Sequence, residues 1–190
     1  MVFVLGAAIG LAAGLLAKGS LTNLASVRFR WPLFVVAALL LKELGVLSPL
    51  SHAGLTPYLY SAGMLGLVAW TLWHLDRLPG VWLVTAGLIA NLAVVLSNGA
   101  HMPVDPGALR GVAPAMASAL REHGTLGQYA LAGPGTHLAW LDDRIPGPFG
   151  AAYSVGDVLT FAGVAVLAFM LTRRPHVRAQ PASRPDRIAG

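Results

Sequence analysis

Residues 58–96, YLYSAGMLGLVAWTLWHLDRLPGVWLVTAGLIANLAVVL, carry the clearest structural signal in this chain. Two apolar runs, Tyr58–Leu75 and Val81–Leu96, flank the short segment Asp76–Gly80. Each run is close to the roughly 17–25 helical residues that cross a hydrocarbon core. Proline followed by glycine ends one helix before the next begins. The stretch therefore predicts two antiparallel helices that cross a membrane.

Three further apolar runs extend this pattern, namely Val2–Ala17, Pro32–Leu47 and Val155–Leu171. Basic residues follow alternate runs, the first, third and fifth: Lys18, Arg28, Arg30, Arg77, Arg173, Arg174, Arg178, Arg184 and Arg187. Such alternation places those connections in the cytoplasm. The charges follow the first run and do not precede it, so we expect a retained span and not a cleaved signal peptide. The pattern predicts an all-α, polytopic membrane bundle with about five transmembrane helices, the N-terminus outside and the C-terminus cytoplasmic.

Composition supports a membrane protein. Of the 190 residues, 56% are hydrophobic and 11% are charged, against about 25% charged in soluble domains. We expect one integral membrane domain over 1–172 and a disordered, basic cytoplasmic tail over 173–190. The net charge of +5 is explained by topology and anionic lipid, so no nucleic-acid partner is expected. Cysteine is absent, which excludes disulfides and thiolate sites.

The first run carries glycines at every fourth position, Gly6, Gly10 and Gly14. At 3.6 residues per turn these lie along one helix face and allow close approach of another helix. That face predicts either packing within the chain's own bundle or a seam with a second copy or a partner subunit.

Polar side chains also occur inside the predicted spans, at Lys42, Glu43 and Asn91. Charges at membrane depth are costly and therefore suggest function. Alternatively, Lys42 and Glu43 reach the outer interface, since their helix ends shortly afterwards. Asn91 either bonds across helices or lines a polar pathway.

The connection between the fourth and fifth spans, residues 98–153, is too long for an ordinary loop. It includes an amphipathic pattern over Pro114–Glu122, which predicts a short helix lying in the outer membrane interface. We interpret the whole connection as a folded outer cap over the helix ends.

Polar residues of this outer region form the candidate site: Asn98, His101, Asp105, His137, Asp142, Asp143, Ser154 and Asp157. They converge if the fourth and fifth spans are neighbours. Histidines with carboxylates suit a divalent metal, and serine with histidine suits a hydrolase, although no compact signature such as H-E-x-x-H or G-x-S-x-G is present.

The same residues have structural explanations. Ser154 and Asp157 have capping-box spacing, Asn98 followed by Gly99 suits a helix end, and Asp142 or Asp143 suits a turn that bonds Arg144 or the backbone.

Three motifs in this region carry a family resemblance: N-G-x-x-M-P-V at 98–104, T-x-L-x-x-L-x-D-x-I-P at 136–146 and S-x-G-D at 154–157. Together they resemble a bacterial family of small polytopic membrane proteins classed as a domain of unknown function. The resemblance implies a multi-pass protein of the bacterial plasma membrane, without an established activity or substrate. His101 stands where the family pattern does not require histidine. The resemblance favours Asn98, Asp143, Ser154 and Asp157 as residues to test.

We expect a non-enzymatic binding or assembly role in the membrane, through the glycine face and the outer polar site. The expected partners are the lipid bilayer and a membrane protein or second copy along the first helix, with no cofactor or bound metal. One alternative is a small ion-coupled transporter that uses Glu43, Asn91 and Asp157. Another is a membrane-surface hydrolase or metalloenzyme built on His101, His137 and Asp143.

Overall fold

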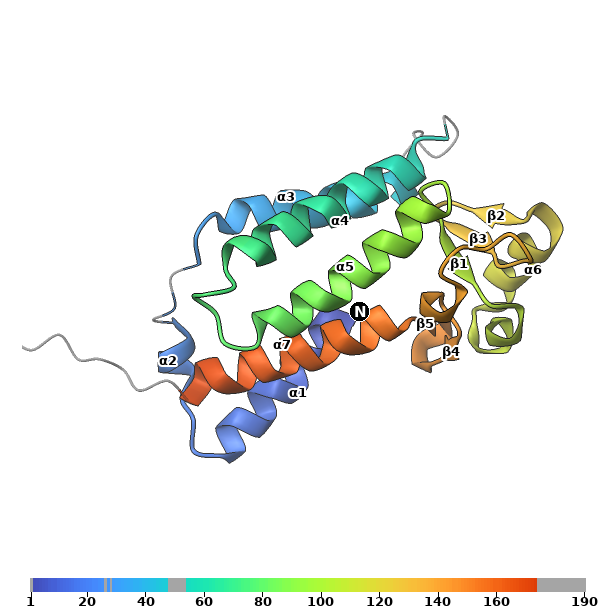
Figure 1. Ribbon diagram of the computed structural model, residues 1–190. Helices are drawn as coiled ribbons and strands as arrows, with labels where there is room; N and C mark the ends of the chain where they lie inside the picture. Colours follow the sequence, from blue (N-terminus) through green and yellow to red (C-terminus); the bar gives the residue numbers. More distant parts are fainter. Residues whose placement is uncertain (1, 26, 28, 48–53, 174–190) are drawn as a thin grey trace, which may run out of the picture.

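Most of the chain is helical in the computed structural model, which describes residues 2–25, 27, 29–47 and 54–173 (Figure 1). The described helices are α1 (Val2–Leu16), α2 (Leu21–Ala25), α3 (Pro32–Leu47), α4 (Thr56–Trp73), α5 (Val81–Ser97), α6 (Pro114–His123) and α7 (Val155–Arg173). The predicted apolar runs fall on α1, α3, α4, α5 and α7, which confirms the predominantly helical fold. The predicted tail, 173–190, lies outside the described residues apart from Arg173, which ends α7.

Among the described residues, one helix is both long and apolar enough to cross a membrane by length and composition, namely α7. Phe3–Leu16 within α1 and Val81–Ser97, which is α5, are shorter apolar helices. The fold is therefore helical with one membrane-length helix, and five spans remain a prediction.

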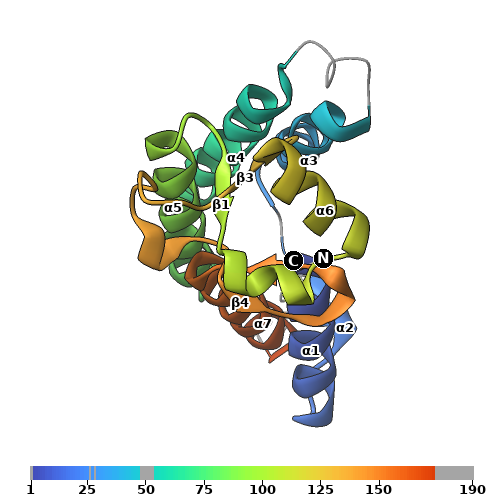
Figure 2. The same cartoon turned by 90° about the vertical axis from the view of Figure 1, so that its right-hand side faces the viewer.

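The long helices pack side by side in the order α1–α7–α5–α4–α3. Viewed along the bundle, they form an arc with α1 and α3 at its two ends (Figure 2). An apolar core fills the space between α4 and α5, where Met64 and Leu67 meet Val84 and Leu88. This core continues into the cap through Met102, so the cap and the bundle share buried apolar side chains.

The glycines of α1 face α7 within the same chain. A Cβ atom on Gly6 would lie 2.8 Å from the carbonyl oxygen of Phe161, and one on Gly10 would overlap the backbone of Ala165. A Cβ atom on Gly14 would overlap the side-chain hydroxyl of Thr172. The glycine face is thus covered by α7, and an association of α1 with another molecule would have to use a different face.

The cap over 98–153 is folded, with short strands that the sequence did not predict. Strand β3 (Tyr129–Leu131) lies between β1 (Met102–Val104), which is parallel to it, and β2 (Thr125–Leu126), which is antiparallel. A second pair joins β4 (Ile145–Pro146) to antiparallel β5 (Ala152–Tyr153). Strands of two or three residues are too short to show an alternating pattern, which explains why the predicted all-α fold did not include them.

Helix α6 packs on the sheet of the cap. Its buried residues, Ala117 and Leu120, join Val104 and Leu109 in a second apolar cluster. The prediction of an amphipathic helix is correct. Its buried apolar side chains, however, serve the interior of the cap, whereas the sequence suggested that they face a membrane interface.

Candidate functional site at the junction of cap and bundle

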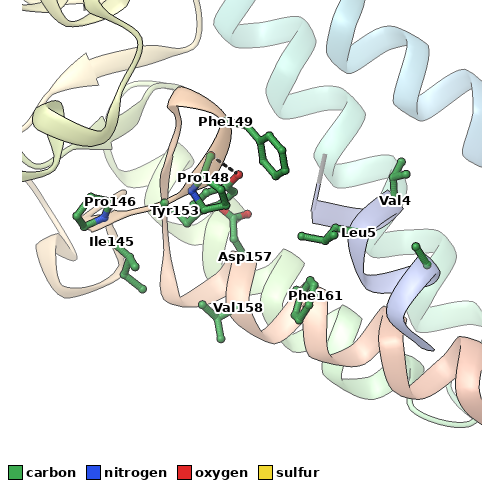
Figure 3. A pocket seen from close by; sticks show the side chains of 12 residues that line it. Val4, Leu5, Ile145, Pro146, Pro148, Phe149, Tyr153, Asp157, Val158 and Phe161 are labelled. Atoms are coloured by element: carbon green, nitrogen blue, oxygen red, sulfur yellow. Dashed lines mark hydrogen bonds between the residues drawn. The ribbon is translucent and has the colours of Figure 1, made fainter. Parts of the chain in front are cut away.

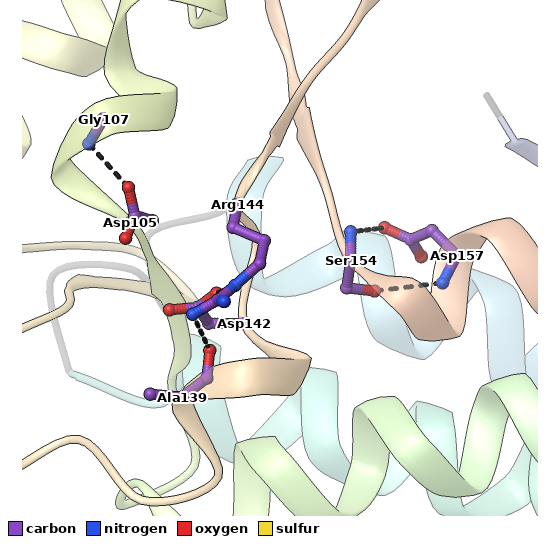
Figure 4. Close-up of polar contacts among 7 residues, drawn as sticks. All are labelled: Asp105, Gly107, Ala139, Asp142, Arg144, Ser154 and Asp157. Carbon is purple, nitrogen blue, oxygen red and sulfur yellow. Dashed lines mark hydrogen bonds and ion pairs between the residues drawn. The ribbon is translucent and has the colours of Figure 1, made fainter.

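The start of α7 is held by a reciprocal capping box. The Ser154 hydroxyl oxygen accepts a hydrogen bond from the Asp157 backbone N–H at 3.0 Å. In return, Asp157 Oδ2 accepts one from the Ser154 N–H at 3.2 Å (Figure 4). The S-x-x-D spacing predicts this arrangement, because it satisfies helix N–H groups that have no partner within the helix.

Asn91 of α5 completes the capping box across the helix interface. The Ser154 hydroxyl donates to Asn91 Oδ1 at 2.7 Å, and Asn91 Nδ2 donates to Asp157 Oδ1 at 2.9 Å. A side chain on Gly156 would collide with the Asn91 amide, so glycine is needed between the serine and the aspartate. Asn91 therefore bonds across helices, one of the two alternatives that the sequence left open.

Asn98 anchors the cap to the end of α5. Its side-chain amide donates to the His137 carbonyl oxygen at 2.9 Å, and its Oδ1 accepts from the His137 N–H at 2.9 Å. The Asn98 side chain thus makes the same pair of reciprocal hydrogen bonds with His137 that a neighbouring strand would make. Both residues line an open cleft of about 410 Å³.

Three other candidates stabilise turns. His101 Nδ1 lies 2.9 Å from the carbonyl oxygen of Gly99, and Asp105 accepts from the Gly107 N–H at 2.7 Å. Buried Asp142 pairs with Arg144 Nε at 2.8 Å (Figure 4), and this hydrogen bond raises the pKa of the Arg144 guanidinium. These contacts agree with the structural explanation of the motif residues.

Asp143 differs from its neighbour because its carboxyl group is buried with an unpartnered oxygen. Its backbone joins β1, donating to the Pro103 carbonyl oxygen at 2.9 Å and accepting from the Asp105 N–H at 3.1 Å. The side chain is 95% buried, and its Oδ1 atom has no hydrogen-bond partner in the structure. Burial, and then the carboxylates of Asp157 and Asp142, raise the pKa of Asp143 well above its ordinary value. The junction therefore favours its neutral, protonated form.

Tyr129, in the central strand of the cap, belongs to the same junction. Burial and the nearby Asp143 carboxylate raise the pKa of Tyr129 to about 12, against an opposing hydrogen bond from Gln128. Asp157 and Glu43 contribute in the same direction, which places both of these acids within electrostatic range. Tyr129 was not predicted, because a single tyrosine in a three-residue strand has no recognisable pattern.

Lys42 and Glu43 pair with each other near the end of α3. Lys42 Nζ lies 3.3 Å from Glu43 Oε1, and the two side chains are 24% and 61% exposed, respectively. Lys42 Nζ also lies 5.1 Å from the centre of the Tyr60 ring, which is within cation–π range. The two predicted intramembrane charges thus compensate each other.

An apolar groove of about 720 Å³ lies between α1, the start of α7 and the segment that joins β4 to β5 (Figure 3). Of the described residues in its lining, Asp157 is the one that is charged, and its carboxylate lies among apolar side chains in the close-up view. The sequence did not indicate this groove, because its walls come from three distant segments. The residues that line the groove are Val4, Leu5, Ala8, Ile145, Pro146, Gly147, Pro148, Phe149, Tyr153, Asp157, Val158 and Phe161.

Within the described part of the chain, no three histidine or acidic side chains come together as a metal site would require. The hydroxyl groups of three serines at the cap-side ends of the helices and in the cap are engaged by other protein groups. Ser97 and Ser118 donate to carbonyl oxygens of their own helices, and Ser154 donates to Asn91.

Fold and site together define a mostly helical protein with a membrane-length helix, a small mixed cap and a polar junction between them. The chain belongs to DUF5317, a family of unknown function, whose sequence model matches residues 26–169. The match confirms the resemblance to a family of unknown function and covers α3 through most of α7 with the cap. No curated protein and no solved structure matches this chain.

Proposed function

We propose that this is a multi-pass protein of the bacterial plasma membrane, with α1, α3, α4, α5 and α7 as spans and the cap outside. Large apolar side chains on these helices are strongly exposed, among them Val4, Leu33, Leu65, Trp82 and Val158 at 50–80%. Exposing so much apolar surface to water is unfavourable, and soluble proteins rarely do so, whereas contact with lipid chains carries no such cost. Helices of 15–19 residues rise about 1.5 Å per residue and approach the hydrocarbon thickness of about 30 Å.

Aromatic residues support the same orientation. Trp31, Trp73 and Trp82 flank the start of α3, the end of α4 and the start of α5, and all three are more than 60% exposed. These helix ends belong to the end of the bundle away from the cap, where the basic connections follow. Tryptophan favours membrane interfaces, so this end suits the cytoplasmic interface.

The proposed role is non-enzymatic binding at the outer end of the bundle, carried by the apolar groove beside Asp157. A volume of about 720 Å³ lies within the roughly 300–1,000 Å³ of ligand sites, which are typically apolar with few polar groups. An ion-coupled transporter is less well supported. Asn91 and Asp157 bond each other, and Glu43 is paired with Lys42.

Topology can be tested with single cysteines, because the chain has none of its own. Ser118→Cys places a thiol on the exposed side of α6, and Asp76→Cys places one in the turn between α4 and α5. In intact cells, a membrane-impermeant maleimide is expected to label Ser118→Cys, and to label Asp76→Cys only after the cells are opened. Labelling of both thiols in intact cells, or the reverse order, would contradict the topology.

Binding can be tested by quantifying the amphiphiles that co-purify with the protein in nanodiscs. Ala8→Trp would fill the groove, whereas Ala12→Trp, on an exposed position of the same helix outside the groove, is the matched control. We expect an amphiphile retained at about one per protein by the wild type and by Ala12→Trp, and lost from Ala8→Trp. Equal retention by the two variants would refute binding in the groove.

A further inference from the structure

We propose that the groove holds a single-chain amphiphile whose head donates hydrogen bonds and is not anionic, with a protonated amine preferred. This inference rests on the proposed binding role and names the chemistry of the ligand. It follows from the shape and chemistry of the two parts of the groove.

The apolar part of the groove fits an alkyl chain. Leu5 of α1 and Val158 of α7 line it and are 40% and 50% exposed, so the groove is continuous with the apolar outer surfaces of both helices. If these helices are spans, the groove opens to lipid, where hydrocarbon chains are the abundant occupant. An alkyl chain would cover this apolar surface without leaving a polar group unpaired.

The wall above the groove has a defined conformation. Phe149 adopts φ 65°, which is uncommon for a residue other than glycine, and its side chain is 65% exposed. The Tyr153 hydroxyl donates to the Pro148 carbonyl oxygen at 3.2 Å, and a side chain on Gly147 would collide with the Tyr153 ring. These constraints present the Phe149 ring at the groove, where it can cover a bound chain (Figure 3).

The head preference follows from Asp157. Its two oxygens accept one side-chain bond from Asn91 and one backbone bond from Ser154, which leaves acceptor capacity on a carboxylate with about four lone-pair sites. Among the residues that the structure describes, no lysine or arginine lines the groove. The nearby cation, Lys42, is paired with Glu43 at 3.3 Å.

An anionic head would meet the like charge of the Asp157 carboxylate, whereas an ammonium or hydroxyl group would find an acceptor in it.

The test compares three 12-carbon probes, dodecylamine, dodecanol and dodecyl phosphate, by competition for the protein in nanodiscs with native mass spectrometry. Wild type and Ala12→Trp are expected to bind the amine at least about tenfold more tightly than the phosphate, with the alcohol between them. Asp157→Asn should remove most of the amine preference while retaining the alcohol.

Two failures are distinguishable. If all three probes bind equally and Ala8→Trp weakens them all, the groove binds amphiphiles and the head preference is wrong. If Ala8→Trp weakens none of them, the proposed binding role and this inference both fail. If the wild type binds dodecyl phosphate more tightly than dodecylamine, the inference is wrong, whatever the variants do.

Discussion

Replacing Asn91 with alanine is expected to destabilise the protein more than any other single loss of a hydrogen-bonding side chain in α5. The side chain accepts from Ser154 and donates to Asp157, and it is 6% exposed. Its removal leaves a buried hydroxyl without its acceptor and a carboxylate oxygen without its donor. Because both partners belong to the capping box of α7, the damage falls on the contact between α5 and α7.

The magnitude can be worked from these two bonds. A neutral hydrogen bond contributes about 1 kcal/mol and a bond to a charged group about 1.5–3 kcal/mol. Hydrogen bonds between helices in membranes contribute less, near about 1 kcal/mol each. We therefore expect Asn91→Ala to lower the free energy of unfolding by about 2–3 kcal/mol.

The matched control is Thr85→Ala on the same helix. Thr85 is also buried, but its hydroxyl donates to the Val81 carbonyl oxygen of its own helix at 3.0 Å. A hydroxyl that bonds the carbonyl four residues earlier in its own helix adds little to stability. The loss is therefore mainly that of one buried methyl group and should cost about 1 kcal/mol. Equilibrium unfolding in mixed micelles, followed by helical circular dichroism, gives both values. If the two variants differ by less than about 0.5 kcal/mol, the cross-helix network does not stabilise the bundle as argued.

Three further substitutions test other parts of the structure. Gly10→Leu should separate α1 from α7 without preventing membrane insertion, because a side chain would overlap the Ala165 backbone; unchanged protease resistance of α1 would contradict this packing. The pKa of Asp143 is raised in the folded state, so this acid stabilises the fold at pH values below its ordinary pKa of 3.8 and loses that contribution as the pH rises. Asp143→Asn should therefore make the free energy of unfolding less dependent on pH. If the free energies of unfolding of the wild type and of Asp143→Asn fall equally from pH 4 upward, Asp143 is not responsible for this dependence. Tyr129→Phe should resist alkaline unfolding between about pH 10 and 12, because the folded phenol, with a pKa of about 12, retains a proton that the unfolded chain releases; identical alkaline midpoints would show that Tyr129 is not the responsible group.

Local patterns were readable from the sequence, whereas tertiary contacts were not. The run predicted over Val155–Leu171 becomes α7 over Val155–Arg173, and Ser154 caps it as the spacing indicates. Both depend on residues within a few turns of one another. The partner of Asn91 lies 66 residues away, so nothing local distinguishes a cross-helix bond from a polar pathway.

Because tertiary contacts could not be predicted, the polar residues proposed as a candidate site include some that only stabilise turns. The residue types alone could not separate Asp142, which is paired with Arg144, from Asp143, whose carboxyl oxygen is buried and unpartnered. The two neighbours differ because an extended backbone directs successive side chains to opposite sides, and the pairing of Asp143 with β1 is a tertiary contact. The groove combines α1, α7 and the β4–β5 segment, and no sequence pattern links these segments.

Asp157 permits one last test that separates helix capping from ligand binding. The cap requires an acceptor for the Ser154 N–H, and a neutral amide can supply it, since capping boxes use glutamine as well as glutamate. A charge beside an apolar groove adds a desolvation cost that capping does not require. The one amide oxygen of Asp157→Asn cannot also accept from Asn91 Nδ2, so the variant loses one of the two cross-helix bonds that Asn91→Ala removes. It is therefore expected to lower the free energy of unfolding by about 1 kcal/mol, less than Asn91→Ala, while it lowers affinity for an amine-headed chain. If the variant instead unfolds as readily as Asn91→Ala and its remaining folded fraction binds the amine as the wild type does, the carboxylate serves the fold and the groove does not use its charge.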